Sequence, residues 1–337
     1  PDIAVSLNDL GNVYQALGQY QEALKYYQQA LEMLKAVYTD NHPDIAISLD
    51  NLGNVYQALG QYQEAFKYYQ QALGMLKAVY RDSHPDIALV LDNLGSIYKA
   101  LGNYQEALKY NQQALEMRKA SYTGNHPRIA ESFHNVGSTY EVLGQYQEAL
   151  KYYQQALEMR QAVYIGNHPH IAASFSNIGD VYKALGQYQE ALKYYQQALE
   201  MRKDFYTGNH PRIAASLSDM GDICKALGQY QEALKYYQQA LQMKQHLYKG
   251  NHPSIARSYN NVGSVYEILG RYQEALKYYQ QALEMQKHLY MDNHPDIAIS
   301  FNSLGSVYQA LGQYQEALKY YQQAFEMMKV LYTGNHP

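Results

Sequence analysis

Small and apolar side chains recur at intervals of three and four residues in two stretches of the first 42 residues. This spacing places them on one face of an α-helix. The first stretch predicts a helix that ends near Leu17, with the face Ile3, Ala4, Leu7, Leu10, Gly11 and Tyr14. The second predicts a helix that reaches about Tyr38, with the face Ala23, Leu24, Tyr27, Ala30, Leu31 and Leu34. Gly18 lies between them and can adopt the left-handed conformation that ends a helix. The pattern predicts a hairpin of helix A followed by helix B.

The same pattern returns every 42 residues without insertion or deletion. A His-Pro dipeptide marks each step, from His42-Pro43 to His336-Pro337. Proline is tolerated in the first turn of a helix, and the Asp that often follows it favours the positive end of the helix dipole. We therefore expect helix A to begin at the proline. The predicted units are 1–42, 43–84, 85–126, 127–168, 169–210, 211–252, 253–294 and 295–336.

The second unit resembles the tetratricopeptide repeat in the order and spacing of eight residues. They are Leu52, Gly53, Tyr56, Gly60, Tyr62, Ala65, Tyr69 and Ala72. Lys77 holds the place of the proline that closes the usual 34-residue repeat, so helix B is expected to continue about two turns further. With LDNLG in helix A and HPDIA at its start, the 42-residue units are similar to the repeats of kinesin light chains. The resemblance covers essentially all of residues 1–337.

One hairpin buries too little apolar surface to offset the conformational entropy that folding removes. Stability must therefore come from stacking each hairpin on the next. We expect an all-α protein, a right-handed α-solenoid superhelix of eight hairpins forming a single array. Helix A is expected to line its concave groove, and helix B to form most of the convex face.

Composition and charge remove several function classes. The chain has 337 residues, 47% hydrophobic and 17% charged, with a net charge of −4. It therefore offers no basic stripe for nucleic acid or anionic lipid, and no apolar run is long enough to span a membrane. The single Cys224 cannot form an internal disulfide, which suits a reducing compartment, and we expect a cytoplasmic location.

Polar positions of helix A that differ between units are the candidates for binding a partner. The expected groove residues are Asn8, Asn12, Asn51, Asn54, Asn93, Lys99, His134, Asn135, Asn177, Lys183, Asp222, Lys225, Arg257, Asn260, Asn261 and Asn302. One column of them is mostly Asn, whose amide can pair with both the N–H and the C=O groups of an extended peptide. The resemblance to kinesin light chains implies the same use of groove asparagines. Alternatively, Asn is a soluble helix residue copied with the unit.

Other ligands are less well supported. The carboxylate clamp of chaperone-binding tetratricopeptide domains is expected to be missing, because no adjacent units supply its basic residues together. Carboxylates slightly outnumber bases on this face, which favours a neutral or basic peptide. The His-Pro histidines lie one to a unit, too far apart to share a metal ion. Cys224 replaces a tyrosine and is expected to be buried rather than reactive. No catalytic motif or phosphate loop is present, so we expect no enzyme, no cofactor and no metal.

Two function classes remain. The first is an adaptor that binds a peptide or protein segment in the groove. The second is a structural array, recently duplicated or designed from a consensus, that stacks end to end through apolar residues at its two ends. These are Ile3, Val5 and Leu7 at one end and Phe325, Met328, Val330 and Leu331 at the other. Sedimentation at high concentration tests this second class, and replacement of groove asparagines tests the first.

Overall fold

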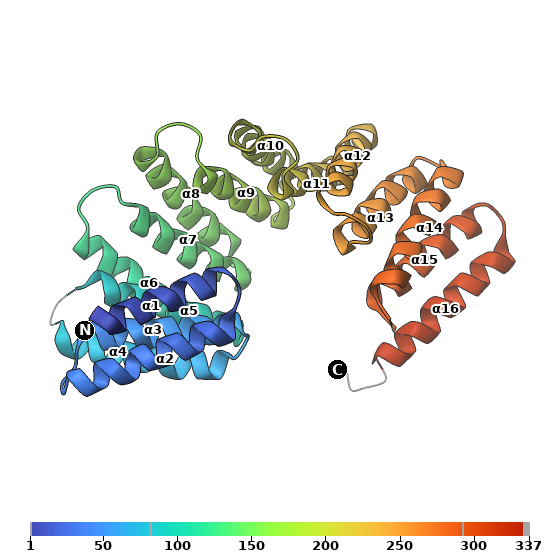
Figure 1. Cartoon of the computed structure of the whole chain (residues 1–337). Coiled ribbons are helices and arrows are strands. Elements are labelled where there is room, and N and C mark those ends of the chain that lie inside the picture. Colours follow the sequence, from blue (N-terminus) through green and yellow to red (C-terminus); the bar gives the residue numbers. More distant parts are fainter. Residues whose placement is uncertain (1, 81–82, 292, 333–337) are drawn as a thin grey trace. The chain divides into compact units, whose positions relative to one another are not determined.

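The computed structural model describes residues 2–80, 83–291 and 293–332. These residues form sixteen α-helices and no strand (Figure 1). The helices are α1 (Asp2–Ala16), α2 (Tyr20–Val37), α3 (Pro43–Ala58), α4 (Tyr62–Val79), α5 (Pro85–Ala100), α6 (Tyr104–Ser121), α7 (Pro127–Val142), α8 (Tyr146–Val163), α9 (Pro169–Ala184), α10 (Tyr188–Phe205), α11 (Pro211–Ala226), α12 (Tyr230–Leu247), α13 (Pro253–Ile268), α14 (Tyr272–Leu289), α15 (Pro295–Ala310) and α16 (Tyr314–Tyr332). The predicted all-α fold of paired helices is confirmed.

The chain divides into two compact units, Pro1–Gly166 and Asn167–Pro337. In each unit, every odd-numbered helix packs against the next even-numbered helix as a hairpin, and the second helix of one hairpin packs on the first helix of the next. Some helices A also contact each other directly: α3 contacts α5, α5 contacts α7, and α13 contacts α15. Each unit is therefore a stack of hairpins with its helices A side by side. The continuity of all eight repeats as one array stays a prediction.

The histidine of each described His-Pro dipeptide forms the N-cap of helix A. Its Nδ1 accepts a hydrogen bond from the backbone N–H two residues further on, as between His84 and Asp86 (3.2 Å). The imidazole ring also stacks on the tyrosine four residues earlier, with ring centroids 3.5 Å apart for Tyr80 and His84. An N-cap acceptor satisfies one of the free N–H groups at the start of a helix. His336, in the last dipeptide, lies outside the described residues.

A glycine of helix A and a tyrosine of helix B hold each hairpin together. A Cβ atom added to Gly53 would lie 2.5 Å from Cε1 of Tyr69, so only glycine lets the ring approach. Tyr69 is fully buried, and its hydroxyl donates to Asn54 Oδ1 (2.8 Å) and Gln57 Oε1 (2.9 Å). These hydrogen bonds, which we call the polar lock, join the two helices of the hairpin.

The third repeat departs from this plan. Asn111 replaces the tyrosine, and its Nδ2 donates across the repeat boundary to Thr139 Oγ1 at 2.9 Å. Thr139 is itself unusual, because the equivalent position is Val or Ile in the other repeats. Both side chains are buried, and Asn111 Oδ1 has no hydrogen-bond partner in the described part of the chain. The boundary between the third and fourth repeats therefore contains a buried polar pair at positions that are apolar or aromatic in the other repeats.

Two further expectations concern exposed and buried residues. Cys224 is buried, as expected. Helix α1 exposes Ile3 and Val5, and α16 exposes Phe325 and Val330. End-to-end self-association through these side chains stays a prediction.

Candidate functional site

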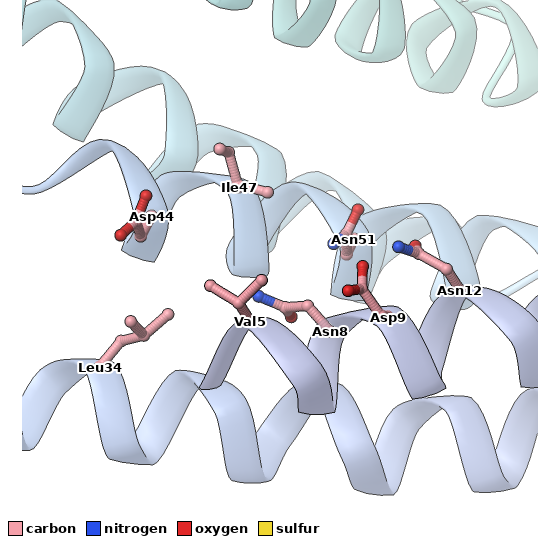
Figure 2. Close-up of a pocket in the computed structure, with 8 residues that line it drawn as sticks. All are labelled: Val5, Asn8, Asp9, Asn12, Leu34, Asp44, Ile47 and Asn51. Carbon is pink, nitrogen blue, oxygen red and sulfur yellow. The ribbon is translucent and has the colours of Figure 1, made fainter. Parts of the chain in front are cut away.

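The polar sides of the helices A form a surface that we call the helix-A face. It consists of Asn8, Asp9, Asn12, Gln15 and their equivalents 42 residues apart, and all the expected groove residues lie on helices A. Three pockets open on it. The first pocket, about 190 Å³, is lined by Val5, Asn8, Asp9, Asn12, Leu34, Asp44, Ile47 and Asn51. Figure 2 shows side chains of α1 and α3 facing this pocket, with Leu34 coming from α2.

The second pocket has the same arrangement as the first and lies one repeat further along the chain. It is about 100 Å³ and is lined by Ala46, Ile47, Asp50, Asn51, Leu76, Asp86, Leu89 and Val90. In both pockets an aliphatic side chain stands exposed at the same position of helix A: Val5 is 50% exposed, Ile47 45% and Leu89 38%. The floor is a buried leucine of helix B, and a carboxylate stands at the side. No basic side chain lines either pocket.

The third pocket lies in the second unit and has a different chemistry. It is about 320 Å³ and is lined by Pro211, Ala214, Ala215, Ser218, Asp219, Asp222, Lys244, Tyr248, Ser254, Arg257 and Asn261. Its lining carries two cations, Lys244 and Arg257, at the positions of the aliphatic Leu34 and Ile47 of the first pocket, together with the carboxylates of Asp219 and Asp222. The helix-A face is therefore apolar and acidic at the first two pockets, in the first unit, and strongly polar at the third pocket, in the second unit.

The asparagines of the expected column differ in what they contact. Asn93 Nδ2 donates to Asp50 Oδ1 of the preceding repeat (2.8 Å), and this bond helps to lower the pKa of Asp50, which burial raises to about 6. Asn51 and Asn261 are half-buried and form no side-chain hydrogen bond in the described part of the chain. Asn51 lines both the first and the second pocket, and Asn261 lines the third. These two amides are available to a ligand.

Most of the other expected groove residues form hydrogen bonds within the protein. Between neighbouring repeats, bonds join Asn8 to Ser48 (3.0 Å), Lys99 to Ser138 (3.0 Å), Lys183 to Asp222 (3.4 Å), Lys225 to Ser264 (3.4 Å) and Asn260 to Ser300 (3.1 Å). Within a hairpin, tyrosine hydroxyls donate to Asn12 (2.7 Å), Asn54 (2.8 Å) and Asp222 (2.5 Å). These side chains have a structural role, and a second role in binding stays a prediction.

The remaining expected residues are not brought together. The His134 ring lies 5.4 Å from the ring of Tyr153, and the backbone oxygen of Asn135 accepts a bond from Thr139 (2.9 Å). Asn177 is half-buried and Asn302 is exposed. Arg257 lines the third pocket.

Sequence reasoning missed a set of basic residues on helix B. At the position of Leu34 and Leu76, the next repeats carry Arg118, Arg160, Arg202 and Lys244. Arg118 is buried 2.5 Å from Asp92, and Lys244 lies in the third pocket near Arg257 of the next repeat. Only helix A was considered for the groove, because helix B was assigned to the opposite face, so the sequence pattern did not place Lys244 beside Arg257. The signal was the change from leucine to a cation at one position in consecutive repeats.

The carboxyl group of Asp219 is poorly stabilised as an anion. Burial and then the neighbouring carboxylates of Asp180 and Asp222 raise its pKa to about 6, although Lys183 and Arg202 act to lower it. The folded state therefore binds a proton more tightly than the unfolded state, so ionisation of Asp219 makes folding less favourable as the pH rises from about 4 to about 6. Above this range the cost is fully present.

Replacing Asp219 with Asn is expected to stabilise the protein at pH 7.5 by about 1–2 kcal/mol, allowing for partial exposure. Asn occupies the equivalent position in five other repeats, so the amide fits. The gain should shrink as the pH falls through 6 and vanish near pH 4. Thermal unfolding of both proteins across this range measures it. A gain that is the same at pH 4 and pH 7.5 would show that ionisation is not its cause.

Among the described residues, no group of three or more His, Cys, Asp or Glu side chains is arranged to hold a metal ion. In the same part of the chain, no helix combines the length and the apolar character needed to cross a bilayer. The surfaces that carry candidate chemistry are the three pockets of the helix-A face.

Comparison with known protein families shows to which family the repeats belong. The model described as "Tetratricopeptide repeat" matches residues 2–78, 51–120, 86–162, 128–204, 170–246, 212–288 and 254–329. The chain belongs to the tetratricopeptide repeat family. Tetratricopeptide repeat proteins are generally scaffolds for protein interactions, and this chain is a scaffold of that kind.

Solved structures agree with this assignment. The putative kinesin light chain nearly identical TPR-like repeats of Podosopora anserina share 27% identity, covering 62% of this chain and 99% of that one, with a TM-score of 0.56. BtubC (BKLC) from P. vanneervenii is 22% identical over 69% of this chain and 94% of that one, with a TM-score of 0.61. The quorum sensor NprR from B. thuringiensis is 20% identical over 95% and 87%, with a TM-score of 0.66. The last two show similarity of fold alone. No curated protein sequence matches the chain.

Proposed function

We propose that this tetratricopeptide protein binds an extended peptide on the helix-A face of its first unit, and that aliphatic side chains of the peptide occupy the first and second pockets. The observation that carries the proposal is the repetition of one pocket at successive repeats, each with an exposed aliphatic side chain and a buried leucine floor. Exposed aliphatic groups beside carboxylates suit a ligand that is both apolar and basic.

The spacing of the pockets suits an extended chain. Packed helices lie about 8–10 Å apart. A peptide in the extended polyproline II conformation advances about 3.1 Å per residue with three residues per turn, so side chains three residues apart lie on the same face and span one repeat. The ligand is therefore a segment with an aliphatic residue at every third position and Lys or Arg between them. The carboxylates of Asp9, Asp44 and Asp86 stand at the sides of the pockets to receive those bases.

Asn51 contributes the contact to the peptide backbone. Its amide lies between the two pockets and forms no internal side-chain hydrogen bond in the described chain. It can therefore donate to a backbone C=O and accept from a backbone N–H of the bound segment. Asn93, at the same position one repeat later, already donates to Asp50.

Replacing Asn51 with Ala is expected to weaken peptide binding about tenfold, because two net hydrogen bonds are lost. The probe is a fluorescent peptide, Leu-Lys-Ser-Leu-Lys-Ser-Leu with blocked ends, titrated with the full chain and followed by anisotropy. A peptide with Ser at each Leu position should not bind. The stability of the protein should not change, because Asn51 has no internal partner to lose.

Asn93→Ala is the matched control, since it makes the same change at the equivalent position. It should lower the free energy of unfolding by about 1 kcal/mol, because buried Asp50 loses a donor. Peptide affinity measured where this variant stays folded should change less than in Asn51→Ala. Equal affinity of the wild type and Asn51→Ala for the leucine peptide would contradict the proposal, as would equal binding of the leucine and serine peptides.

A further inference from the structure

The third pocket contains a lysine that the protein leaves without a counter-ion. Lys244 on α12 is half-buried, and its Nζ donates to Ser218 Oγ (3.1 Å) and Ser258 Oγ (2.9 Å). Within the described residues, no carboxylate oxygen lies within 4.0 Å of this ammonium. Its pKa is lowered, first by burial and then by the charge of Arg257, while the carboxylates of Asp219 and Asp222 raise it by less. Burying a charge without an opposite charge is costly, so the site is suited to receive one.

Arg257 on α13 lines the same pocket and is exposed. In the described part of the chain its guanidinium forms no hydrogen bond or ion pair, so its five N–H donors face solvent. The equivalent residues in the second and eighth repeats are Ile47 and Ile299. An arginine at this position is thus a local feature of the seventh repeat, next to the lysine.

The residues at the position of Lys244 in other repeats show which contacts a side chain forms there. Arg118, at the position of Lys244, lies 2.5 Å from Asp92 and donates to Ser132 Oγ (2.7 Å). In the seventh repeat the position is Gln286, whose Oε1 accepts a bond from Ser300 (2.7 Å). Lys244 therefore has serine contacts like those of Arg118 without the carboxylate that pairs with Arg118.

The two carboxylates of the pocket do not fill this role. Asp222 accepts from the hydroxyl of Tyr237 (2.5 Å) and from Lys183 Nζ (3.4 Å), and no oxygen of it lies within 4.0 Å of Lys244 Nζ. Asp219 is half-buried beside Asp180 and Asp222, and the charged groups around it also include Lys183 and Arg202. The pocket therefore has an acidic edge that is already partly neutralised and a cationic edge that is not.

We propose that the third pocket binds an oxyanion, a carboxylate or a phosphate, carried by a peptide that lies on the helix-A face of the second unit. Lys244 and Arg257 are its cations, and the free amide of Asn261 is a further donor. The inference rests on the proposed function in that it takes the ligand to be a peptide. An anion between an ammonium and a guanidinium forms charge-assisted hydrogen bonds, which are the strong ones.

Two probes test the pocket directly: sodium acetate stands for a carboxylate and inorganic phosphate for a phosphate. Each is titrated into the full chain at pH 7.5 by calorimetry, with sodium chloride adjusted to hold the ionic strength constant. We expect saturable millimolar binding of at least one probe, and the tighter probe identifies the oxyanion. Lys244→Gln and Arg257→Ile should each weaken it at least fivefold. Both variants are expected to fold, because Gln286, Ile47 and Ile299 occupy the equivalent positions.

Lys235→Gln is the charge-matched control. Lys235 lies on α12 outside the pocket and pairs with Glu232 at 3.6 Å, so its replacement should leave anion binding unchanged. Asp219→Asn should strengthen binding, because it removes a negative charge from the lining. With acetate as the probe, which stays ionised in this range, lowering the pH through about 6 should have the same effect in the wild type and little effect in Asp219→Asn.

The absence of saturable binding of either probe to the wild type would overturn the proposal. So would equal weakening by Lys235→Gln and Lys244→Gln. These outcomes are separate from those of the leucine peptide, whose site in the first unit contains neither Lys244 nor Arg257. If the peptide binds and the anions do not, the anion site alone is wrong. If the anions bind and the peptide does not, the proposed peptide site of the first unit is wrong.

Discussion

Replacing Tyr69 with Ala is expected to lower the free energy of unfolding of the first unit by about 4 kcal/mol. The ring is fully buried and packs against Gly53. Because Gly53 has no side chain, it cannot fill the space that is left when the ring is removed. Its hydroxyl supplies a donor to both Asn54 and Gln57. The substitution therefore leaves a cavity between the two helices of one hairpin and removes the polar lock at the same time. Urea unfolding followed by circular dichroism measures the loss.

Two other tyrosine variants separate these effects. Tyr69→Phe keeps the ring and should cost only about 1 kcal/mol, the net value of the hydroxyl contacts. Tyr314→Ala is the control for composition, since Tyr314 is 68% exposed and its loss should change stability by less than about 0.5 kcal/mol. If Tyr69→Ala unfolds no more easily than Tyr314→Ala, the packing of Gly53 on Tyr69 is not what holds the hairpin together.

The second large effect is expected at the polar pair between the third and fourth repeats. Replacing Asn111 with Tyr restores the residue of the other seven repeats and should stabilise the first unit by about 2 kcal/mol. The gain comes from burying an aromatic ring and from removing the buried Asn111 Oδ1, which has no hydrogen-bond partner in the described chain. Urea unfolding of the full chain measures it.

A double-mutant cycle with Thr139→Val tests the coupling of the two substitutions. In the natural background, Thr139→Val should destabilise the protein, because Asn111 Nδ2 loses its acceptor at 2.9 Å. In the Asn111→Tyr background the same change should be neutral or stabilising, because valine or isoleucine occupies that position in the other repeats. The coupling energy should be about 1–2 kcal/mol. Additive effects of the two changes would mean that the pair does not act as a unit.

The fold could be predicted from particular residues. The prolines after each histidine set the start of helix A, and the glycines at 18 and its equivalents set its end with positive φ, as at Gly60 (φ +73°). The spacing of Gly53, Ala65, Tyr69 and Ala72 predicted the hairpin, and the structure pairs the helices accordingly. Local signals were sufficient because each hairpin is built from contacts close in the sequence.

The binding surface could be predicted only in part. The sequence placed Asn51, Asn93 and Asn261 in one column but could not tell them apart, because their difference lies in a partner more than forty residues away. It also missed Lys244, since helix periodicity assigns a residue to a face of its own helix and not to the neighbouring repeat. The use of the helix-A face by a peptide remains our proposal.

The sequence by itself determined the repeat length, the helical hairpin and the family, because each depends on residue type at short, regular spacing. The tertiary structure alone decided which of the equivalent polar side chains form hydrogen bonds or ion pairs within the protein and which do not. A hydrogen bond or ion pair across stacked repeats depends on distances of a few ångströms between separate helices, and one repeat's neighbours determine whether its amide or ammonium finds a partner. That is why Asn93 donates a hydrogen bond to the preceding repeat while Asn51 faces a pocket. It is also why Arg118 forms an ion pair with Asp92 while Lys244, in the third pocket, has no carboxylate of the described residues within 4.0 Å.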